Sequence, residues 1–70
     1  MDREYVSSSN IRSIGYDATS QTLEIEFNSG GIYQYFGVPE YVYDELMAAP
    51  SHGTYFHQNI KDCYQCIRIN

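Results

Sequence analysis

Apolar and polar side chains alternate strictly along residues 22–28, TLEIEFN. The apolar positions are Leu23, Ile25 and Phe27, and the polar positions are Thr22, Glu24 and Glu26. Such alternation predicts a β-strand with one buried face and one solvated face. Strand-like segments over residues 11–17 and 32–36 flank it, separated from it by the loop ATSQ and the turn NSGG.

The length of the second turn decides which face the tyrosines of the third strand occupy, because a one-residue slip moves every side chain to the other face. A three-residue loop over residues 28–30, ending in a glycine with left-handed backbone, places Tyr33 and Tyr35 on the apolar face. A two-residue loop would instead bury Gln34 against apolar side chains. Since a buried amide without partners costs about 1–3 kcal/mol, we favour the three-residue loop.

Two short amphipathic helices are expected after the strands. The apolar stripe of the first comprises Val38, Val42, Leu46 and Ala49, and that of the second comprises Phe56, Ile60 and Cys63. Pro39 suits the first helical position, where its missing N–H costs nothing, and Pro50 ends the first helix at the preceding residue. Ser51 is a natural N-cap for a second helix over residues 52–62, in which Cys63 would be a small buried side chain at the end of the stripe.

The order of these elements predicts one α+β domain, a three-stranded antiparallel β-meander followed by two short α-helices packed on one face. Residues 1–70 form this single domain, with a core from about residue 5 to residue 69. The tail over residues 64–70 is compatible with a last short strand or with an extended segment. A chain of this length buries only about 60% of the surface that it exposes when unfolded, and its eight tyrosines and three phenylalanines supply large side chains for the core.

The charge balance narrows the function classes. Nine acidic residues face four basic ones, for a net charge of −5, which argues against the broad basic face that nucleic-acid binding normally uses. No stretch is long and apolar enough to span a membrane. The first residues, MDREYVSSSN, lack the apolar segment of a signal peptide, so we expect a cytoplasmic protein.

Candidate chemistry is sparse. Cys63 and Cys66 form a C-x-x-C pair that His52 and His57 could complete to a zinc set, but the ligand order is the reverse of the usual one. We therefore expect ordinary reduced thiols, with no metal and no cofactor. Ser51 is explained as a helix cap, and neither a nucleophile elbow nor a phosphate-binding loop occurs, so no catalytic residue and no enzyme activity are expected.

A non-catalytic binding module is the function that remains. A protein partner or self-association is favoured, because Ile32 and Phe36 would face outward on an exposed edge strand. RNA is the alternative partner, since aromatic rings on a sheet with nearby cations can hold single strands. That platform would comprise Tyr33, Tyr35, Arg12 and Lys61 in the two-residue register. In that register Glu24 and Glu26 would stand beside the tyrosines and repel phosphate.

The expected binding surface joins the third strand to the start of the second helix. It comprises Tyr33, Tyr35, Ser51, His52, Gly53 and Lys61. We include the start of this helix because a glycine at position 53 permits close approach of a partner to the backbone. Close packing of the helix against the sheet explains the same glycine at least as well.

Several short segments also carry a family resemblance. They are Ser8-Ser9-Asn10-Ile11, Gly15-Tyr16-Asp17, Leu23 to Phe27, Gly30 or Gly31, Tyr33-Gln34-Tyr35, Val38-Pro39, Ser51-His52-Gly53, Tyr55-Phe56, Ile60-Lys61 and Tyr64. Over residues 5–69 the chain resembles the KTSC domain. The resemblance implies a short bacterial or phage protein, or the C-terminal extension of some lysyl-tRNA synthetases from which the family takes its name. It implies no established activity. The occurrence of the domain on lysyl-tRNA synthetases suggests RNA binding, but the acidic charge of this chain weakens that suggestion.

Overall fold

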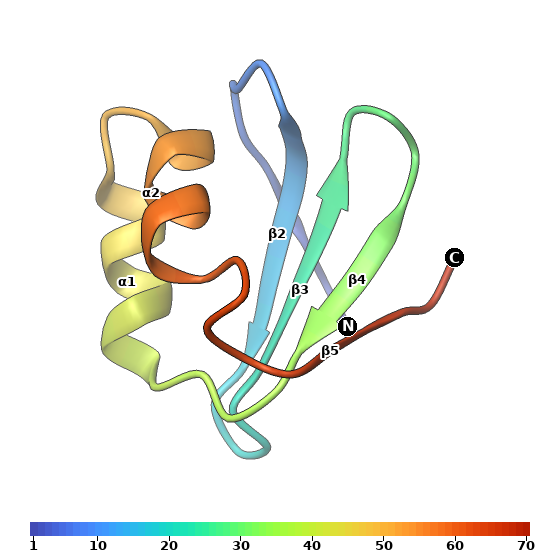
Figure 1. The fold of residues 1–70 in the computed structure, drawn as a ribbon, viewed down its shortest axis with the longest axis vertical. Helices are drawn as coiled ribbons and strands as arrows, with labels where there is room; N and C mark the ends of the chain where they lie inside the picture. The colour runs from blue at the N-terminus through green and yellow to red at the C-terminus, as the bar shows by residue number, and fades with distance from the viewer.

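Five strands form one antiparallel sheet, and both helices lie against the same face of it (Figure 1). The computed structural model describes residues 1–70. The strands are β1 (Glu4–Tyr5), β2 (Ile11–Asp17), β3 (Thr22–Phe27), β4 (Ile32–Tyr35) and β5 (Cys66–Arg68), in the spatial order β1-β2-β3-β4-β5, and the helices are α1 (Glu40–Ala48) and α2 (His52–Asn59). The predicted α+β class and the two helices on one face are confirmed, whereas the prediction of three strands is wrong.

The two additional strands lie at the edges of the sheet. β1 pairs with β2, and β5 pairs with β4, both antiparallel. Because β5 covers β4, the expectation of an open edge strand is wrong, and Ile32 is not exposed, although Phe36 is exposed as expected, at 37%. Ile32 is half-buried, and the backbone N–H of Phe36 donates to the carbonyl of Gln65 at 2.9 Å.

The β3–β4 hairpin has the predicted register. Ile25 pairs with Tyr33 and Leu23 pairs with Tyr35. Gly30, with φ of +108°, ends the loop, and its N–H donates to the carbonyl of Phe27 at 2.9 Å. Tyr33 and Tyr35 therefore face the helices, as the three-residue loop predicts.

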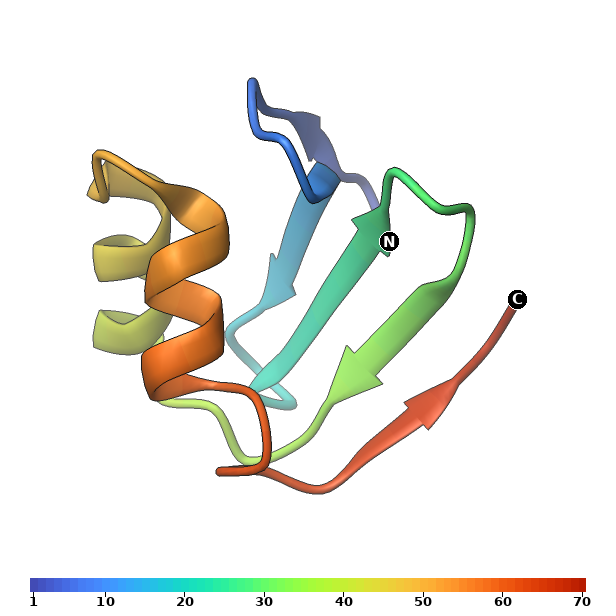
Figure 2. The same cartoon turned by 45° about the horizontal axis from the view of Figure 1, so that its top comes forward.

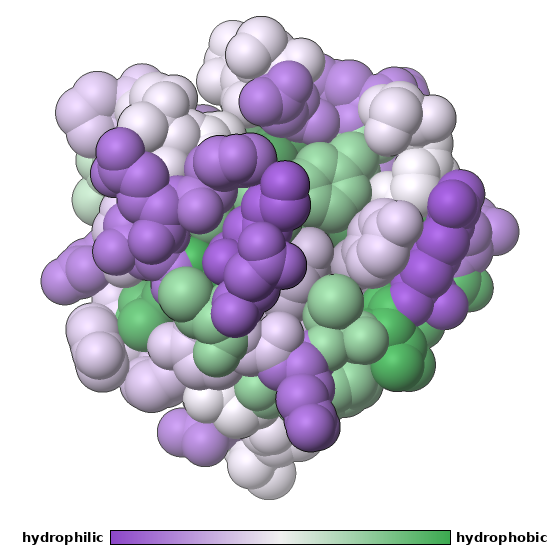
Figure 3. All heavy atoms as spheres, viewed as in Figure 1, coloured by the Kyte–Doolittle hydropathy of each residue, from purple (hydrophilic) through white to green (hydrophobic).

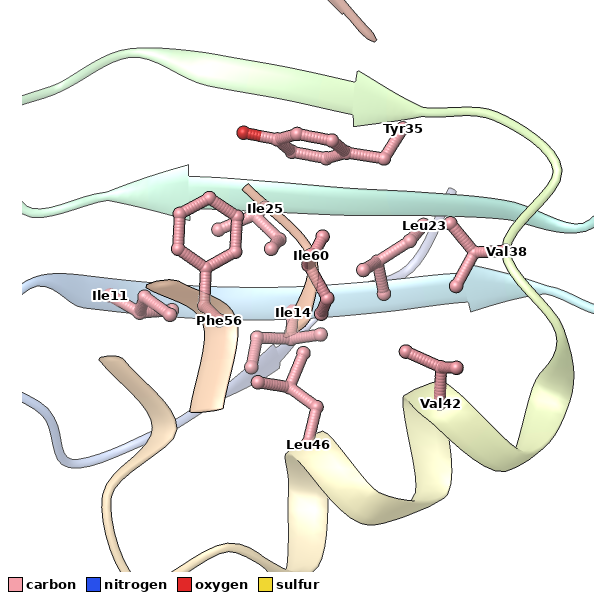
Figure 4. Close-up of a cluster of buried hydrophobic side chains, with 10 residues drawn as sticks. All are labelled: Ile11, Ile14, Leu23, Ile25, Tyr35, Val38, Val42, Leu46, Phe56 and Ile60. Atoms are coloured by element: carbon pink, nitrogen blue, oxygen red, sulfur yellow. The ribbon is translucent and has the colours of Figure 1, made fainter. Parts of the chain in front are cut away.

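The core lies between the sheet and the two helices. It contains ten buried apolar residues, Ile11, Ile14, Leu23, Ile25, Tyr35, Val38, Val42, Leu46, Phe56 and Ile60. Figure 4 shows the helix side chains pointing toward those of β2, β3 and β4. At one side of this core, Tyr16 stacks on Tyr43 with ring centroids 4.9 Å apart and donates its hydroxyl to the carbonyl of Val38 at 2.6 Å.

The helix ends differ slightly from those predicted. Pro39 is the N-cap of α1 rather than its first helical residue, because its ψ of 151° is extended. α2 ends at Asn59, and Asp62 then turns the chain with φ of +64°. Cys63 is consequently exposed, so the prediction that it is buried is wrong, and Tyr64 packs against the core instead. Neither helix has the length and apolar character needed to cross a membrane.

The outer face of the sheet, opposite the helices, is not solvated as the alternation in β3 predicts. Glu24 is only 4% exposed, and Ser13 on β2 is fully buried. Arg3 reaches over this face and contacts both residues. The polar positions of β3 thus face a layer of polar partners rather than water.

Candidate binding groove

An open groove lies on the helix side of the sheet, between α2 and β4. Figure 2 shows that β4 and β5 extend beyond the region that the helices cover. The groove has a volume of about 610 Å³. In the space-filling view of Figure 3, separate hydrophobic patches on this side of the molecule lie between hydrophilic side chains.

Four aromatic rings from three elements form the walls of the groove, Phe27 from β3, Tyr33 and Tyr35 from β4, and Phe56 from α2. Phe27 meets Tyr33 edge to face at 5.7 Å and meets Phe56 in the same way at 5.3 Å. Edge-to-face contacts of this kind are favourable and hold the rings in defined orientations. The walls are therefore ordered before any ligand arrives.

Tyr35 lies deepest, with 5% of its surface exposed. Burial, with smaller contributions from negative charge on Cys66, Tyr33 and Asp62, raises the pKa of its hydroxyl to about 12. The phenol is therefore neutral near pH 7. Tyr33 is half-buried, and the guanidinium carbon of Arg68 lies 5.9 Å from the centre of its ring.

The rim of the groove is polar and carries few charges. Asn10 and Asn28 contribute amides, and Lys61 contributes a cation. Asp62 is the only one of the nine acidic residues that lines the groove. The groove is thus much less acidic than the chain as a whole.

Four of the six predicted surface residues line this groove, and two do not. Tyr33, Tyr35, Gly53 and Lys61 lie in its lining. Ser51 instead caps α2, its hydroxyl oxygen accepting from the N–H of Thr54 at 3.2 Å. His52 Nδ1 lies 2.8 Å from the carbonyl oxygen of Leu46 and so links the start of α2 to α1.

Gly53 brings α2 close to the loop between β1 and β2. A Cβ atom at this position would lie 3.3 Å from Nδ2 of Asn10 and 3.8 Å from Oγ of Ser8. The glycine therefore packs within the domain, against this loop rather than against the sheet. Beyond it a smaller cavity of about 250 Å³, lined by Thr54 and Gln58 among others, continues the groove.

Sequence reasoning missed Phe27, Phe56 and Asn10 as groove residues. The first two were assigned to the core, because an alternating or helical pattern cannot distinguish a buried ring from one at the edge of a groove. Asn10 lies in the SSSN segment. The only sign that this residue could belong to a binding site was that the segment is part of the family resemblance.

Both cysteines are free and exposed, and Cys66 also lines the groove. No group of three or more His, Cys, Asp or Glu side chains lies close enough together to hold a metal ion. The absence of a metal and of a cofactor stays a prediction.

The fold and the groove define a class, small α+β domains with one aromatic-walled groove on the helix side of the sheet. The model of the KTSC domain family matches residues 7–64, and the chain belongs to this family. The crystal structure of a KTSC domain protein from Yersinia pestis has a TM-score of 0.97 with this chain at 46% identity, and the match covers 99% of this chain and 97% of that one.

Relatives occur as short proteins and as parts of long ones. A protein of Stutzerimonas stutzeri is 46% identical over 87% of this chain and 86% of its own length. A lysine–tRNA ligase of Nostoc sp. is 55% identical over 73% of this chain, and a lysine–tRNA ligase of Trichormus variabilis is 53% identical over the same share. The matched segment is only 9% of the length of these ligases. The resemblance to the domain found in lysyl-tRNA synthetases is thus confirmed.

Proposed function

We propose that this KTSC domain is a non-catalytic binding module and that the groove between α2 and β4 is its binding site. The observation that carries the proposal is the open groove itself, whose lining includes four aromatic rings, with Phe27 and Tyr33 half-buried and Tyr35 and Phe56 buried at its base. Its volume of about 610 Å³ lies within the range of about 300–1,000 Å³ that is usual for ligand sites. Aromatic walls with a few polar groups at the rim are typical of such sites.

Two further features support a role without catalysis. The hydroxyl of Ser51 and the imidazole of His52 are both engaged in holding α2 in place. Cys66 and His57 line the groove, but no hydrogen bond joins the thiol to the imidazole, as an activated nucleophile would require. We also infer a cytoplasmic location, which the two free, exposed cysteines support because thiols stay reduced there.

A segment of another protein is the partner that we favour. The rim offers the amides of Asn10 and Asn28, which can both donate to and accept from a peptide backbone. Lys61 and Asp62 balance each other in charge, so the rim does not select a polyanion. The net charge of −5 acts against the long-range attraction of nucleic acid.

RNA is the second candidate, and one observation favours it. The observed register separates Tyr33 and Tyr35 from Glu24 and Glu26, whose side chains lie on the opposite face of the sheet. The carboxylates of Glu24 and Glu26 are thus absent from the groove, which keeps only that of Asp62, and Arg68 lies over the Tyr33 ring. The similarity to a segment of lysine–tRNA ligases points the same way.

Selection of peptides from a displayed library on the full chain, followed by affinity measurements, tests the proposal. We expect the selected peptides to lose at least about tenfold in affinity on Tyr33→Ala and to bind Tyr41→Ala like the unaltered protein. Tyr41 is the matched control because it is 63% exposed and does not line the groove. Peptides that tolerate Tyr33→Ala would place the binding site elsewhere.

The same proteins are titrated with an eight-nucleotide RNA at low and moderate salt. Binding that weakens with salt and with Tyr33→Ala, in the absence of any selected peptide, would put the RNA candidate first. Failure of both probes contradicts the groove as a binding site. Sedimentation at two concentrations tests a second copy as the partner, and a monomer at both removes it.

A further inference from the structure

Tyr35 is the only buried tyrosine of the chain, and its hydroxyl has no hydrogen-bond partner within the domain. The tyrosine hydroxyls that do donate hydrogen bonds are those of Tyr16 and Tyr55, which are only half-buried. Each of these two bonds is 2.6 Å long. Because a buried phenol usually finds a partner, the free hydroxyl of Tyr35 marks a polar group that the fold itself does not use.

This hydroxyl opens into the groove between α2 and β4. Every side-chain nitrogen or oxygen atom that is sealed from solvent has a hydrogen-bond partner, so the unpaired oxygen of Tyr35 is not sealed. Tyr35 lines the groove, and in Figure 4 its ring lies alongside β4 with the oxygen directed away from Val38 and toward the side on which Phe56 stands. The hydroxyl is thus one polar atom on an otherwise aromatic floor.

The surroundings of the hydroxyl decide what kind of ligand the floor accepts. The rings of Phe27, Tyr33 and Phe56 enclose it. A ligand that covered the floor with apolar atoms alone would remove water from the hydroxyl and leave its proton without an acceptor, which is costly. A site with such a donor rejects analogues that lack the matching group for the same reason. The floor therefore selects a ligand that brings an acceptor oxygen.

The charges near the hydroxyl favour an acceptor that is itself uncharged. Burial is the main cause of the raised pKa of Tyr35, and nearby negative charge, including that of Asp62, adds to it. The cations lie further out, since Lys61 is exposed and Arg68 lies over the Tyr33 ring outside the lining of the groove. A carboxylate or phosphate oxygen on the floor would lose its hydration and meet repulsion, whereas a carbonyl oxygen has no charge to desolvate.

We propose that the Tyr35 hydroxyl selects the ligand of the groove by donating a hydrogen bond to an uncharged amide carbonyl of a peptide segment from a partner protein. This inference rests on the function proposed for the groove and names the chemical group that the partner places on its floor. Peptide backbones and the side chains of asparagine and glutamine all carry such a carbonyl. Their N–H groups suit the carboxylate of Asp62, which lines the same groove.

Benzamide is the probe for this contact, because it joins one aromatic ring to one uncharged amide. It is titrated at millimolar concentrations into the full chain, and binding is followed by the amide chemical shifts of the groove residues. We expect Tyr35→Phe to bind benzamide about fivefold more weakly than the unaltered protein, since one neutral hydrogen bond is lost. Tyr41→Phe, whose exposed hydroxyl lies outside the groove, is the matched control and should bind like the unaltered protein. Benzoate, which has the same shape and a negative charge, should bind the unaltered protein at least about fivefold more weakly than benzamide does.

The urea midpoint at pH 7 separates a contact with the ligand from a role in the fold. Tyr35→Phe keeps the ring that contacts Phe56 and removes a hydroxyl that has no partner in the domain. We therefore expect this variant, without ligand, to unfold at the same midpoint as the unaltered protein or at a higher one. Weaker binding of benzamide at an undiminished midpoint supports the proposal, and a lowered midpoint would overturn it.

The peptides selected on the full chain distinguish this inference from the proposed function. Peptides that weaken on Tyr33→Ala but bind Tyr35→Phe like the unaltered protein would keep the groove and overturn the role of its floor. Equal binding of benzamide to Tyr35→Phe and the unaltered protein, or benzoate that binds as tightly as benzamide, would overturn it as well. Uridine that weakens on Tyr35→Phe, with no peptide selected, would assign the floor to a base carbonyl of RNA and overturn the choice of a peptide. If no peptide, benzamide or uridine binds in the groove, the proposed function fails together with this inference.

Discussion

The rings of Tyr35 and Phe56 meet edge to face, with their centroids 5.5 Å apart and their planes at 75°. Tyr35 belongs to β4 and Phe56 to α2, so this contact fastens the helix to the sheet at the floor of the groove. Phe27 contacts the same Phe56 ring from β3. Phe56 therefore stabilises the fold and shapes the groove at once.

Replacing Phe56 should be among the most damaging changes in the chain. Phe→Ala in a core costs about 3–5 kcal/mol, and a domain of this size has only about 3–5 kcal/mol to lose. We expect Phe56→Ala to be largely unfolded in water, and Phe56→Leu to remain folded with a lower urea midpoint. Urea unfolding followed by circular dichroism measures both. Tyr41→Ala, on the exposed face of α1, should stay within about 0.5 kcal/mol of the unaltered protein. A cooperative transition of normal midpoint in Phe56→Ala would contradict the assigned role.

The hairpin register could be predicted because one local choice decides it. A loop ending at Gly30 puts both tyrosines inside, and the alternative buries Gln34 among apolar side chains. Gln34 is half-buried in the observed register too, but there its amide donates to the carboxylate of Glu24. The register is therefore decided by whether the buried amide has a partner, and not by whether it is buried. Sequence alone indicates the face of a strand, but not what covers it.

Gly30 gives a prediction with a purely backbone cause. Its φ of +108° is unfavourable for a residue with a side chain, and a Cβ atom there would have no neighbour within 4 Å. We expect Gly30→Ala to lower the free energy of unfolding by about 1–2 kcal/mol, with no loss of packing. Ser29→Ala, in the same loop, is the control and should change it by less than about 0.5 kcal/mol. Equal effects of the two substitutions in urea unfolding would show that the backbone of Gly30 is not under this constraint.

The features that sequence reasoning missed all depend on contacts between distant segments. β1 and β5 have two and three residues, and all of these are exposed, so no hydrophobic alternation marks β1, and the pattern of residues 64–70 does not decide between the strand β5 and an extended segment. Cys63 continues the spacing of Phe56 and Ile60, but α2 ends before it, and the Ile60 and Lys61 N–H groups both donate to the carbonyl of Phe56. Two of the four aromatic walls of the groove were predicted, because the positions of Tyr33 and Tyr35 follow from the register. The rest depends on how far the helices extend over the sheet.

Glu24 should make the stability of the domain depend on acid. Burial by itself raises the pKa of this carboxyl, but the hydrogen bonds from Gln34 and Arg3, together with the charge of Arg3, outweigh burial and leave the pKa below its ordinary value. In the unfolded chain the pKa is about 4.3. The ionised group therefore stabilises the folded state above that pH, and the contribution is lost as the pH falls through the lower, folded-state pKa.

The urea midpoint of the unaltered protein and of Glu24→Gln, measured from pH 7 to pH 3, tests this assignment. We expect the unaltered protein to be the more stable of the two at pH 7 and the difference to shrink as the pH falls below about 4. Glu40→Gln, at an exposed position in the first turn of α1, controls for the general effect of removing a carboxylate. A constant difference between Glu24→Gln and the unaltered protein across this range would show that Glu24 is not the group responsible.

Tyr35 should make the domain sensitive to alkali. Burial raises the pKa of its hydroxyl to about 12, whereas a tyrosine in an unfolded chain titrates near 10. The folded state therefore prefers the neutral phenol, and the stability that this preference contributes is complete below about pH 10 and is lost as the pH rises toward 12. Tyr35→Phe keeps the ring that contacts Phe56 and removes the ionisable group. We expect its urea midpoint to fall less than that of the unaltered protein between pH 9 and about 11.5, while the exposed-site control Tyr41→Phe follows the unaltered protein. If Tyr35→Phe and the unaltered protein lose stability in parallel, the Tyr35 hydroxyl is not the group whose ionisation opens the core.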